Sequence, residues 1–423
     1  MPDFPLPSNE EQRLKEVQGL RFAEWDTRKI LDDLCIVAAR LLGTPIAHLS
    51  LVDRYEQLFA GKYGLDADRT GREVAFCAHT IMEALPFIVE DAANDPRFSQ
   101  NPLVTDTPRI GSYLGVPLET APGLRVGALC AVDRKPRAFT EADIRTLEKL
   151  GAFAVLIIKG FRAALDFNDQ MTSAIELQKK MLPSKARIKA IEDALPLELA
   201  SRYKALDGVG GDIWGTETLG PHCLLLFIAD FTGHGLAAAL NMARFHSFAH
   251  MECHRADDPA QILRRLNRRL IEVLPVGQFA TMFCAVLDFE AQIIKYASAG
   301  SPPQLYRRSS SAAFELLAKP AVPLGILQSA VYESETLPFQ PGATLVLYTD
   351  ALIETPRPPN QIFTPESLKR LVSMDPSRSA AELRAKIMNA LLVDPTVPID
   401  DDITLVIALH TNEPMTPLLN FSI

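Results

Sequence analysis

The chain has 423 residues, more than one ordinary domain accommodates, so two or more domains are expected. A hydrophobic fraction of 48% and a charged fraction of 22% are typical of a soluble globular protein. The net charge of −9 excludes broad, non-specific binding to nucleic acid.

Three further features bear on the compartment. Residues 1–13 contain no apolar core of the kind that a signal peptide needs. The longest apolar run outside the expected strands, residues 152–158, is too short to span a bilayer. The 6 cysteines are scattered without CxxC spacing, which indicates reduced thiols rather than a disulfide framework. We therefore expect a cytoplasmic protein that does not contact the membrane.

The first third of the chain mixes helical and strand patterns. Apolar residues recur at helical spacing over 14–42, where Gly43 ends the helix, and again in a short piece at 76–82. Strand patterns occur at residues 46–53, 57–61, 87–91, 112–118 and 125–133. The first two strands are expected to pair as a hairpin, and a helix from Glu141 closes this unit.

This order of elements, together with local motifs, resembles a GAF domain. The matching residues are Asp91 and residues 50–53, 76–79, 95–98, 113–118 and 127–130. The resemblance covers residues 20–162 and implies an antiparallel sheet with helices that senses an unknown small ligand or dimerises. Some GAF domains attach a bilin through a cysteine beside a histidine, but here Ala78 separates Cys77 from His79. We therefore favour a structural Cys/His pair over a chromophore or metal site.

A long helix is expected to follow. Residues 141–180 contain no proline, and apolar residues alternate at steps of three and four, which is typical of a coiled-coil seam. The residues of this stripe are Leu147, Leu150, Ala154, Ile157, Phe161 and Leu165, with Met171, Ile175 and Leu182 farther on. Residues 145–158 are expected to pack on the GAF sheet, and the remainder on a partner helix in a parallel homodimer. Pro183 ends the helix, and residues 178–183 are a candidate coupling element.

The second half alternates strands and helices. Strand patterns occur at residues 197–203, 224–230, 279–287, 293–299, 304–306, 313–317, 344–350 and 403–409, and helical patterns at 236–253, 258–273, 365–373 and 379–392. Asp230 and Asp350 stand at the C-terminal ends of apolar strands, and Asp401 stands before one. Neighbouring antiparallel strands bring such ends together, so we expect the three carboxylates on one sheet edge. The glycine loop 207–212 is expected to place Asp212 over them.

Single aspartates near strand ends are usually turn or capping residues, but their repetition beside apolar strands favours a site. Clustered carboxylates without histidine or cysteine suit hard cations such as Mg²⁺ or Mn²⁺. Two ions that share Asp230 would hold a bridging water and place it for in-line attack on phosphorus. The predicted chemistry is phosphoester hydrolysis without a covalent intermediate.

The aspartate motifs resemble those of metal-dependent PPM-type serine/threonine phosphatases, closest to the SpoIIE-like, stress-response branch. They lie at residues 210–212, 229–235, 348–350 and 401–404, with further similarity at 266–267, 279–281 and 299–303. The resemblance implies an α-β-β-α sandwich, so the predicted fold class is α+β: a GAF domain, a long connecting helix and a PPM sandwich. It also implies that Asp230 bridges two Mn²⁺ or Mg²⁺ ions, with Asp350 and Asp401 on one ion and Asp212 and the Phe231 carbonyl on the other.

Three departures from the family pattern are expected to change the substrate handling or to lower the rate. Ser301 stands where histidine is usual, Ala351 where glycine is common, and Gly215 where an acidic residue is common. His234, between two glycines, is interpreted as a turn residue rather than a general acid. For Trp214, a groove-lining role and a packing role stay open.

We therefore expect a GAF-regulated, metal-dependent protein-serine/threonine phosphatase that acts on a phosphoprotein of the anti-anti-sigma (STAS) type. The alternative is a catalytically weak or inactive phosphatase-like scaffold that binds a signalling partner. The expected segments are an N-terminal extension (1–19), the GAF sensor (20–162), a helical linker (163–184), the phosphatase domain (185–410) and a C-terminal tail (411–423).

Overall fold

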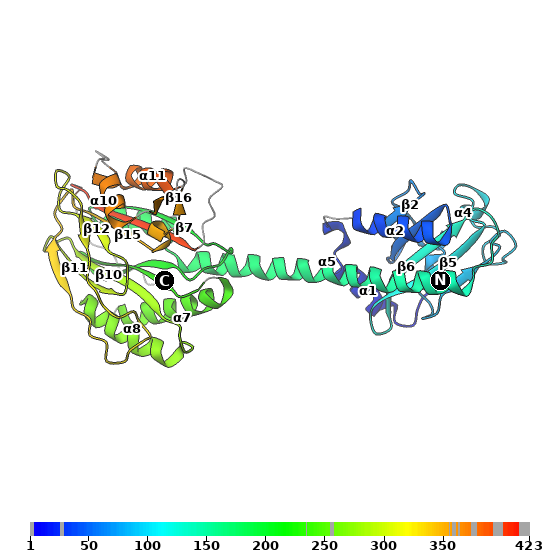
Figure 1. Ribbon diagram of the computed structural model, residues 1–423, viewed down its shortest axis with the longest axis horizontal. Helices are drawn as coiled ribbons and strands as arrows, with labels where there is room; N and C mark the ends of the chain where they lie inside the picture. The colour runs from blue at the N-terminus through cyan, green and yellow to red at the C-terminus, as the bar shows by residue number, and fades with distance from the viewer. Residues whose placement is uncertain are drawn as a thin grey trace. The chain divides into compact units, whose positions relative to one another are not determined.

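A computed structural model describes the chain except for residues 1–3, 26–28, 234, 254–257, 355, 358–360, 363, 374–378, 392–400 and 414–423. The chain divides into two units, Met1–Asp169 and Gln170–Ile423 (Figure 1). Among the described helices, none has the length and apolar character needed to cross a membrane.

The first unit is built on one antiparallel sheet with strand order β3-β2-β1-β6-β5-β4. Its strands are β1 (Ile46–Val52), β2 (Glu56–Tyr63), β3 (Arg69–Gly71), β4 (Phe87–Val89), β5 (Ser112–Ala121) and β6 (Leu124–Asp133). β1 is buried along its whole length because both faces of the sheet are covered. Alternate residues serve the two faces: Leu49 and Leu51 pack in one core, and Ile46 and Val52 in the other. The predicted hairpin of the first two strands is confirmed.

The helical segments of this unit are α1 (Glu10–Gly19), η1 (Phe22–Glu24), α2 (Lys29–Leu42), η2 (Arg72–Val74), α3 (Cys77–Thr80), α4 (Pro102–Thr105) and α5 (Glu141–Met181). α2 and the first half of α5 cover one face of the sheet, and α3 covers the other. The prediction of one helix over 14–42 is wrong. Arg21 adopts the left-handed conformation (φ 53°), and the Trp25 indole donates a hydrogen bond to the Leu20 carbonyl (2.8 Å), so the chain turns between α1 and α2.

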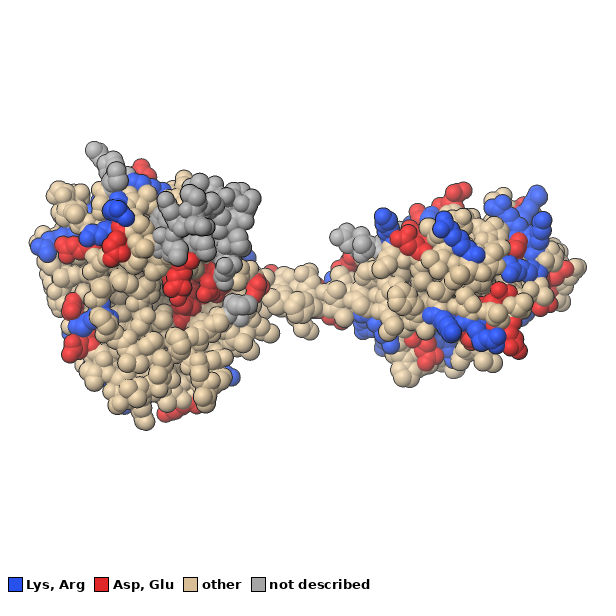
Figure 2. Space-filling model, viewed as in Figure 1, with Lys and Arg blue, Asp and Glu red and all other residues tan. Residues whose placement is uncertain are grey.

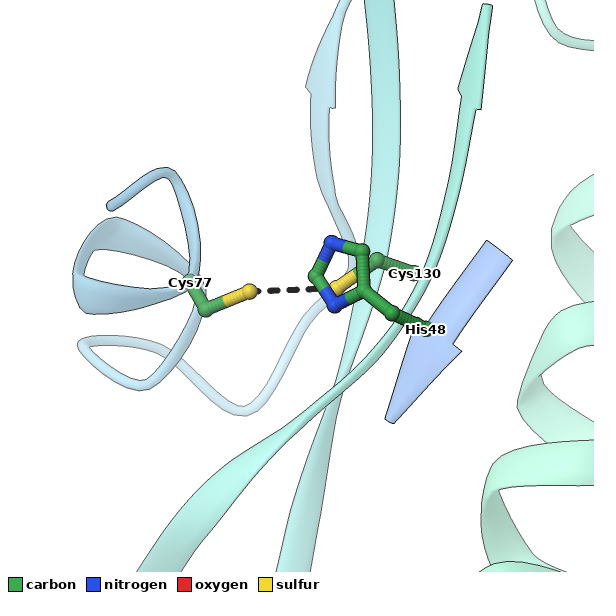
Figure 3. Close-up of side chains that lie close together, drawn as sticks. All are labelled: His48, Cys77 and Cys130. Carbon is green, nitrogen blue, oxygen red and sulfur yellow. Dashed lines mark hydrogen bonds between the residues drawn. The ribbon is translucent and has the colours of Figure 1, made fainter. Parts of the chain in front are cut away.

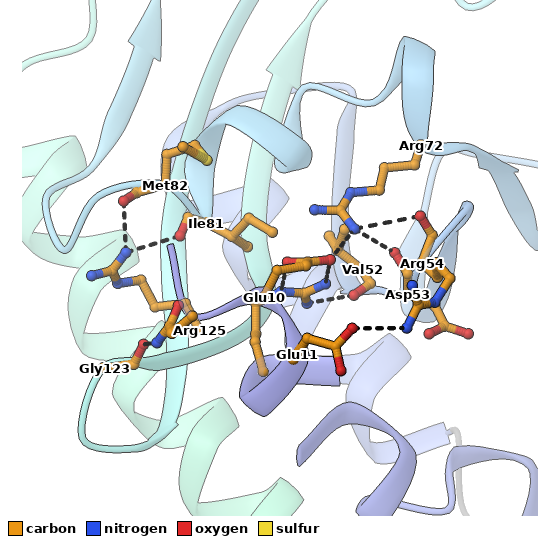
Figure 4. A network of polar contacts seen from close by, with 12 residues as sticks. Glu10, Glu11, Val52, Asp53, Arg54, Arg72, Ile81, Met82, Gly123 and Arg125 are labelled. Atoms are coloured by element: carbon orange, nitrogen blue, oxygen red, sulfur yellow. Dashed lines mark hydrogen bonds and ion pairs between the residues drawn. The ribbon is translucent and has the colours of Figure 1, made fainter. Parts of the chain in front are cut away.

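A buried ionic network joins α1 to the sheet (Figure 4). The Glu10 carboxylate accepts hydrogen bonds from Arg13 (Nε, 2.8 Å) and from Arg72. Both guanidinium groups are completely buried, and Arg13 also donates to the Val52 carbonyl at the end of β1. Burial opposes ionisation of Glu10, but the hydrogen bonds from the two arginines outweigh it and lower the pKa of Glu10 to about 2.

We expect Glu10→Gln to destabilise the first unit by about 2 kcal/mol, because two buried guanidinium groups lose their counter-charge. The contribution of the ionised Glu10 to the free energy of unfolding is fully present above pH 4.5 and is lost as the pH falls toward 2. Urea unfolding followed by Trp25 fluorescence, in a Trp214→Phe background, measures it because the chain has only 2 tryptophans. Glu11→Gln is the control, since the Glu11 side chain is 83% exposed. Equal effects of both substitutions would contradict the prediction.

The connecting helix α5 begins at Glu141 as predicted and ends at Met181, before Leu182 and Pro183. The predicted seam of α5 packs on the first unit beyond the expected range of 145–158, because Phe161 and Leu165 also contact the core of that unit. A different stripe of α5 is exposed. Its members are Phe153, Leu156, Phe167 and Leu177, with exposed fractions of 54%, 66%, 64% and 58%.

The second unit contains two five-stranded sheets, ordered β14-β11-β10-β9-β8 and β13-β12-β15-β18-β7. The first sheet comprises β8 (Ile213–Gly220), β9 (Cys223–Phe231), β10 (Ala280–Asp288), β11 (Ile293–Ala299) and β14 (Glu335–Pro338). The second comprises β7 (Leu197–Lys204), β12 (Gln304–Arg307), β13 (Glu315–Leu317), β15 (Thr344–Tyr348) and β18 (Ile403–His410). A two-stranded sheet of β16 (Pro356–Arg357) and β17 (Gln361–Ile362) is separate.

The helices of the second unit are α6 (Lys185–Ala194), α7 (Gly235–Cys253), α8 (Pro259–Val273), α9 (Ala351–Glu354), α10 (Pro365–Ser373) and α11 (Ala380–Leu391). One core lies between the sheets, with Leu226 and Ile228 facing Leu345 and Val406. α7 and α8 cover the outer face of the first sheet, and α10 and α11 that of the second (Figure 1). The predicted α-β-β-α sandwich is confirmed. α6, β8 and β14 are elements that the sequence patterns did not predict.

Candidate metal centre

Three of the predicted site residues lie at the ends of interior strands of the two stacked sheets. Asp230 is the penultimate residue of β9 in the first sheet. Asp350 follows β15 and Asp401 precedes β18, which are antiparallel neighbours in the second sheet. The expectation that antiparallel neighbours bring strand ends together is therefore confirmed for Asp350 and Asp401. The prediction that Asp230 shares the same sheet with them is wrong. Asp230 reaches the others because the two sheets are stacked. A patch of acidic side chains is visible on one face of this unit (Figure 2).

Burial and mutual repulsion act strongly on these carboxyl groups. Burial, followed by the charges of Asp350 and Asp401, raises the pKa of Asp230 to about 8, although a hydrogen bond with Asp212 opposes the rise. Burial and the charge of Asp230 likewise raise the pKa of Asp212 well above its usual range. Carboxyl groups that hold protons near neutral pH become fully ionised when a cation balances their charge. The all-oxygen donor set therefore fits divalent cations such as Mn²⁺ or Mg²⁺.

Asp212 is held by two threonines. It is only 1% exposed, and its Oδ2 accepts hydrogen bonds from Thr349 Oγ1 (2.8 Å) and Thr404 Oγ1 (2.6 Å). Thr349 precedes Asp350, and Thr404 lies at the start of β18. The threonines therefore tie Asp212 to the chain segments that carry Asp350 and Asp401. Sequence reasoning did not assign them a role, although each threonine lies within three residues of a predicted ligand.

Asp402 organises the glycine loop, and the sequence analysis did not single it out. It is 2% exposed and accepts hydrogen bonds from the backbone amides of Leu206 (2.8 Å) and Gly211 (2.6 Å). A Cβ on Gly210 would lie 1.9 Å from Asp402 Oδ2, and one on Gly211 would lie 2.7 Å from the Phe231 carbonyl oxygen. Glycine is therefore required for the loop to approach both groups. Asp401, beside it, is less buried, and its Oδ1 accepts from the Asp402 amide (2.8 Å).

The end of α5 also holds the glycine loop. Gln178 is 4% exposed; its Nε2 donates to the Gly210 carbonyl (2.7 Å), and its Oε1 accepts from the Gly210 amide (3.1 Å). Ile175, one turn earlier, lies against Gly208, where a Cβ would be 3.0 Å from Ile175 Cδ1. One amide side chain thus satisfies both backbone groups of the residue two positions before Asp212.

Of the three departures from the family pattern, Gly215 has a local explanation. A Cβ on Gly215 would lie 2.4 Å from Phe227 Cζ, so the phenyl ring occupies the place of a side chain there. Ser301 Oγ accepts from Gln304 Nε2 (3.0 Å), and Ala351 is buried at the start of α9. Trp214 is 2% exposed and packs between the two sheets, so its role is packing. His234 lies outside the described residues.

The pH dependence of stability should reveal the repulsion among these carboxylates. Between 3.8 and about 8, the folded protein holds more protons on Asp230 than the unfolded chain does. We therefore expect the metal-free protein to lose stability as the pH rises through this window, by at most about 1.4 kcal/mol per pH unit for one proton. Saturating Mn²⁺ should flatten the slope. Trp214 fluorescence in a Trp25→Phe background follows this unit, and a metal-free stability that rises with pH would refute the prediction.

Comparison with known proteins agrees with this architecture. The SiaA-PP2C domain of Pseudomonas aeruginosa superposes with a TM-score of 0.52 at 18% identity, covering 59% of this chain and 98% of that domain. The second unit therefore has the PP2C fold. Residues 220–411 match the family Stage II sporulation protein E (SpoIIE), and residues 26–158 match the GAF domain. The chain thus joins an N-terminal GAF domain to a C-terminal SpoIIE-type PP2C phosphatase domain.

Two curated relatives each match about half of this chain. Phosphoserine phosphatase RsbP of Bacillus subtilis is 25% identical over 221 residues, which are 51% of this chain and 52% of RsbP. Cyclic di-GMP phosphodiesterase PA2567 of Pseudomonas aeruginosa is 35% identical over 202 residues, 46% of this chain and 34% of that protein. The chain therefore matches between a third and about half of the length of these relatives.

Proposed function

We propose that the chain is a GAF-regulated, metal-dependent protein-serine/threonine phosphatase. The observation that carries the proposal is the cluster of Asp212, Asp230, Asp350 and Asp401 at the facing sheet edges, with a pKa of Asp230 raised to about 8. Such a cluster has no structural use, since burial and repulsion both destabilise it. The match to the SpoIIE family and to phosphoserine phosphatase RsbP supports the same chemistry.

In this proposal, two Mn²⁺ or Mg²⁺ ions would share Asp230 as a ligand. Asp350 and Asp401 would hold one ion, and Asp212 and the Phe231 carbonyl would hold the other. The ions, when bound, supply an activated water and charge stabilisation at the phosphoryl group. The chain's own contribution is positioning: Thr349 and Thr404 fix Asp212, and Asp402 holds the glycine loop that carries it.

The proposed substrate is a phosphoserine or phosphothreonine protein, of the anti-anti-sigma (STAS) type. Its support is the match to two phosphoserine phosphatases of Bacillus subtilis, RsbP and RsbU, which are 25% and 29% identical over 51% and 43% of this chain. The carboxylate cluster would attract a phosphate group when it holds cations, whereas without cations it would repel phosphate.

We further propose that α5 carries the regulatory signal from the GAF domain, which would bind a small ligand. In the exposed stripe of α5, Leu156 follows Phe153 by three residues. Phe167 lies 14 residues after Phe153, and Leu177 lies 21 residues after Leu156, so the stripe keeps the seven-residue repeat of a coiled-coil seam. Its occupant in the proposal is α5 of a second copy, giving a parallel homodimer. Gln178 would pass a change in this helix to the glycine loop.

Hydrolysis of p-nitrophenyl phosphate and of a phosphoserine protein, with Mn²⁺ and with excess chelator, tests the activity. We expect turnover with Mn²⁺ and none with chelator. Absence of turnover on both substrates at saturating Mn²⁺ would overturn the proposal and favour the alternative, a phosphatase-like scaffold that binds a signalling partner. Ser301 and Ala351, which depart from the family pattern, are the residues that motivate this alternative.

A further inference from the structure

The core of the GAF domain brings together three side chains that bind soft or borderline metals. His48 lies directly opposite Cys130 in the antiparallel pair of β1 and β6, so both side chains point to the same face of the sheet. α3 covers that face and supplies Cys77 (Figure 3). The ligand atoms of these three residues all lie within 4.8 Å of one another, and all three residues are buried. The phosphatase chemistry uses none of them.

The sequence pattern indicated a pair of Cys77 and His79, but in the structure the neighbour of Cys77 is Cys130. Cys77 Sγ lies 3.2 Å from Cys130 Sγ. The His79 ring instead stacks on Phe87 (5.7 Å between centroids) and meets Phe98 edge-on (4.9 Å). The sequence pattern did not predict that Cys130 and His48 lie near Cys77, because their proximity depends on the register of β1 and β6.

His48 has a buried ring nitrogen without a hydrogen-bond partner among the described residues. Its side chain is 5% exposed, and Nδ1 has no hydrogen-bond partner among the described residues. A buried polar atom without a partner is costly unless a ligand satisfies it. His48 and Cys77 border a cavity of about 310 Å³, whose lining also includes Gln57 and Thr70. Each of these two residues has a buried side-chain oxygen without a hydrogen-bond partner among the described residues. The site therefore combines an imidazole nitrogen that has no hydrogen-bond partner with an adjoining cavity.

We propose that His48, Cys77 and Cys130 bind one thiophilic divalent cation of the zinc class, with the fourth coordination position directed to the cavity. Tetrahedral zinc has Zn–S bonds of about 2.3 Å, which separates two sulfur ligands by about 3.8 Å. The observed 3.2 Å requires only a small rotation of the side chains. Binding displaces one proton from each thiol, and two thiolates balance the charge of the cation, so the buried site is neutral.

Tyr113 is the positioning residue of this site. Its hydroxyl lies 3.3 Å from Cys77 Sγ and 3.0 Å from Cys130 Sγ, and 2.7 Å from Thr80 Oγ1. With Thr80 as donor to the tyrosine oxygen, the phenolic proton is free to bond a thiolate. Metal-binding thiolates are commonly oriented by such a hydrogen bond from the surrounding shell.

Cobalt(II) titration of the reduced full-length protein tests the proposal. Excess Mg²⁺ is present to occupy the aspartate site, whose oxygen ligands give no thiolate absorption. We expect one equivalent of cobalt to produce thiolate-to-cobalt charge-transfer absorption and the strong visible bands of tetrahedral cobalt, and zinc to abolish both. Cys77→Ser, Cys130→Ser and His48→Gln should each weaken cobalt binding by at least about a hundredfold. Tyr113→Phe should weaken it by about tenfold and shift the charge-transfer band.

Cys35→Ser is the matched control, because Cys35 is a buried thiol of the same domain that lies in the other core. It should leave the cobalt spectrum unchanged. Circular dichroism identifies any variant that fails to fold. If a cysteine variant fails to fold, His48→Gln still tests the site, because it keeps both thiols. No charge-transfer band in the reduced protein overturns the proposal, as does a band that survives in His48→Gln. A Cys77–Cys130 disulfide formed on air oxidation, without metal uptake by the reduced protein, also overturns it. None of these outcomes bears on phosphatase activity.

Discussion

Asp230→Asn is expected to lower Mn²⁺-dependent turnover by about a thousandfold or more, the cost of removing a preorganised electrostatic group from a reaction centre. Asparagine keeps the size of the side chain but removes the charge that two cations would share. The same substitution should stabilise the metal-free protein near pH 8, because it removes the carboxyl group that repels Asp350 and Asp401. Loss of activity together with a gain in metal-free stability is a combination that a purely structural role for Asp230 does not produce.

Asp288→Asn provides the matched control. Asp288 ends β10 and pairs with Cys223 at the start of β9, so it lies at the opposite end of the same sheet from Asp230. This variant should keep turnover close to that of the unchanged protein. If both variants were equally active, or if Asp230→Asn lost stability without a change in turnover, the assignment of Asp230 as a shared metal ligand would be wrong.

Local sequence patterns were enough to predict the strands that carry the site. β9, β15 and β18 are apolar runs flanked by aspartate, and such runs report burial wherever they fall in the fold. The division of these strands between two sheets was not predictable in the same way. Antiparallel polarity relates neighbours within a sheet, whereas Asp230 meets Asp350 by the stacking of two sheets, which leaves no periodic signal.

The positioning residues show the same limit at the level of single side chains. Asp401 and Asp402 are adjacent and chemically identical, yet only Asp402 caps the glycine loop, because the backbone directs it toward Leu206 and Gly211. Likewise, β8 was missed because its sequence, with glycine and threonine among few apolar residues, lacks a strong pattern. Its strand conformation comes from pairing with β9, a non-local cause.

Gln178→Ala is expected to reduce turnover by about a hundredfold, the typical result of misplacing a catalytic group by about an ångström. The substitution leaves the amide and the carbonyl of Gly210 unpaired in a buried position, at a cost of about 1–3 kcal/mol for each group. The loop can recover these hydrogen bonds only by moving toward water. Such a movement carries Asp212 away from Thr349 and Thr404.

The kinetic signature distinguishes this role from general destabilisation. If Gln178 acts by placing Asp212, the variant should need more Mn²⁺ for half-maximal activity, and high Mn²⁺ should restore part of the turnover. Lys179→Ala, at the exposed neighbouring position of α5, should change neither quantity. Gln178→Glu keeps the acceptor for the Gly210 amide but opposes a carboxylate to the Gly210 carbonyl, so it should not rescue activity. Equal turnover and equal Mn²⁺ dependence in Gln178→Ala and Lys179→Ala would exclude the end of α5 as the element that couples the helix to the metal centre.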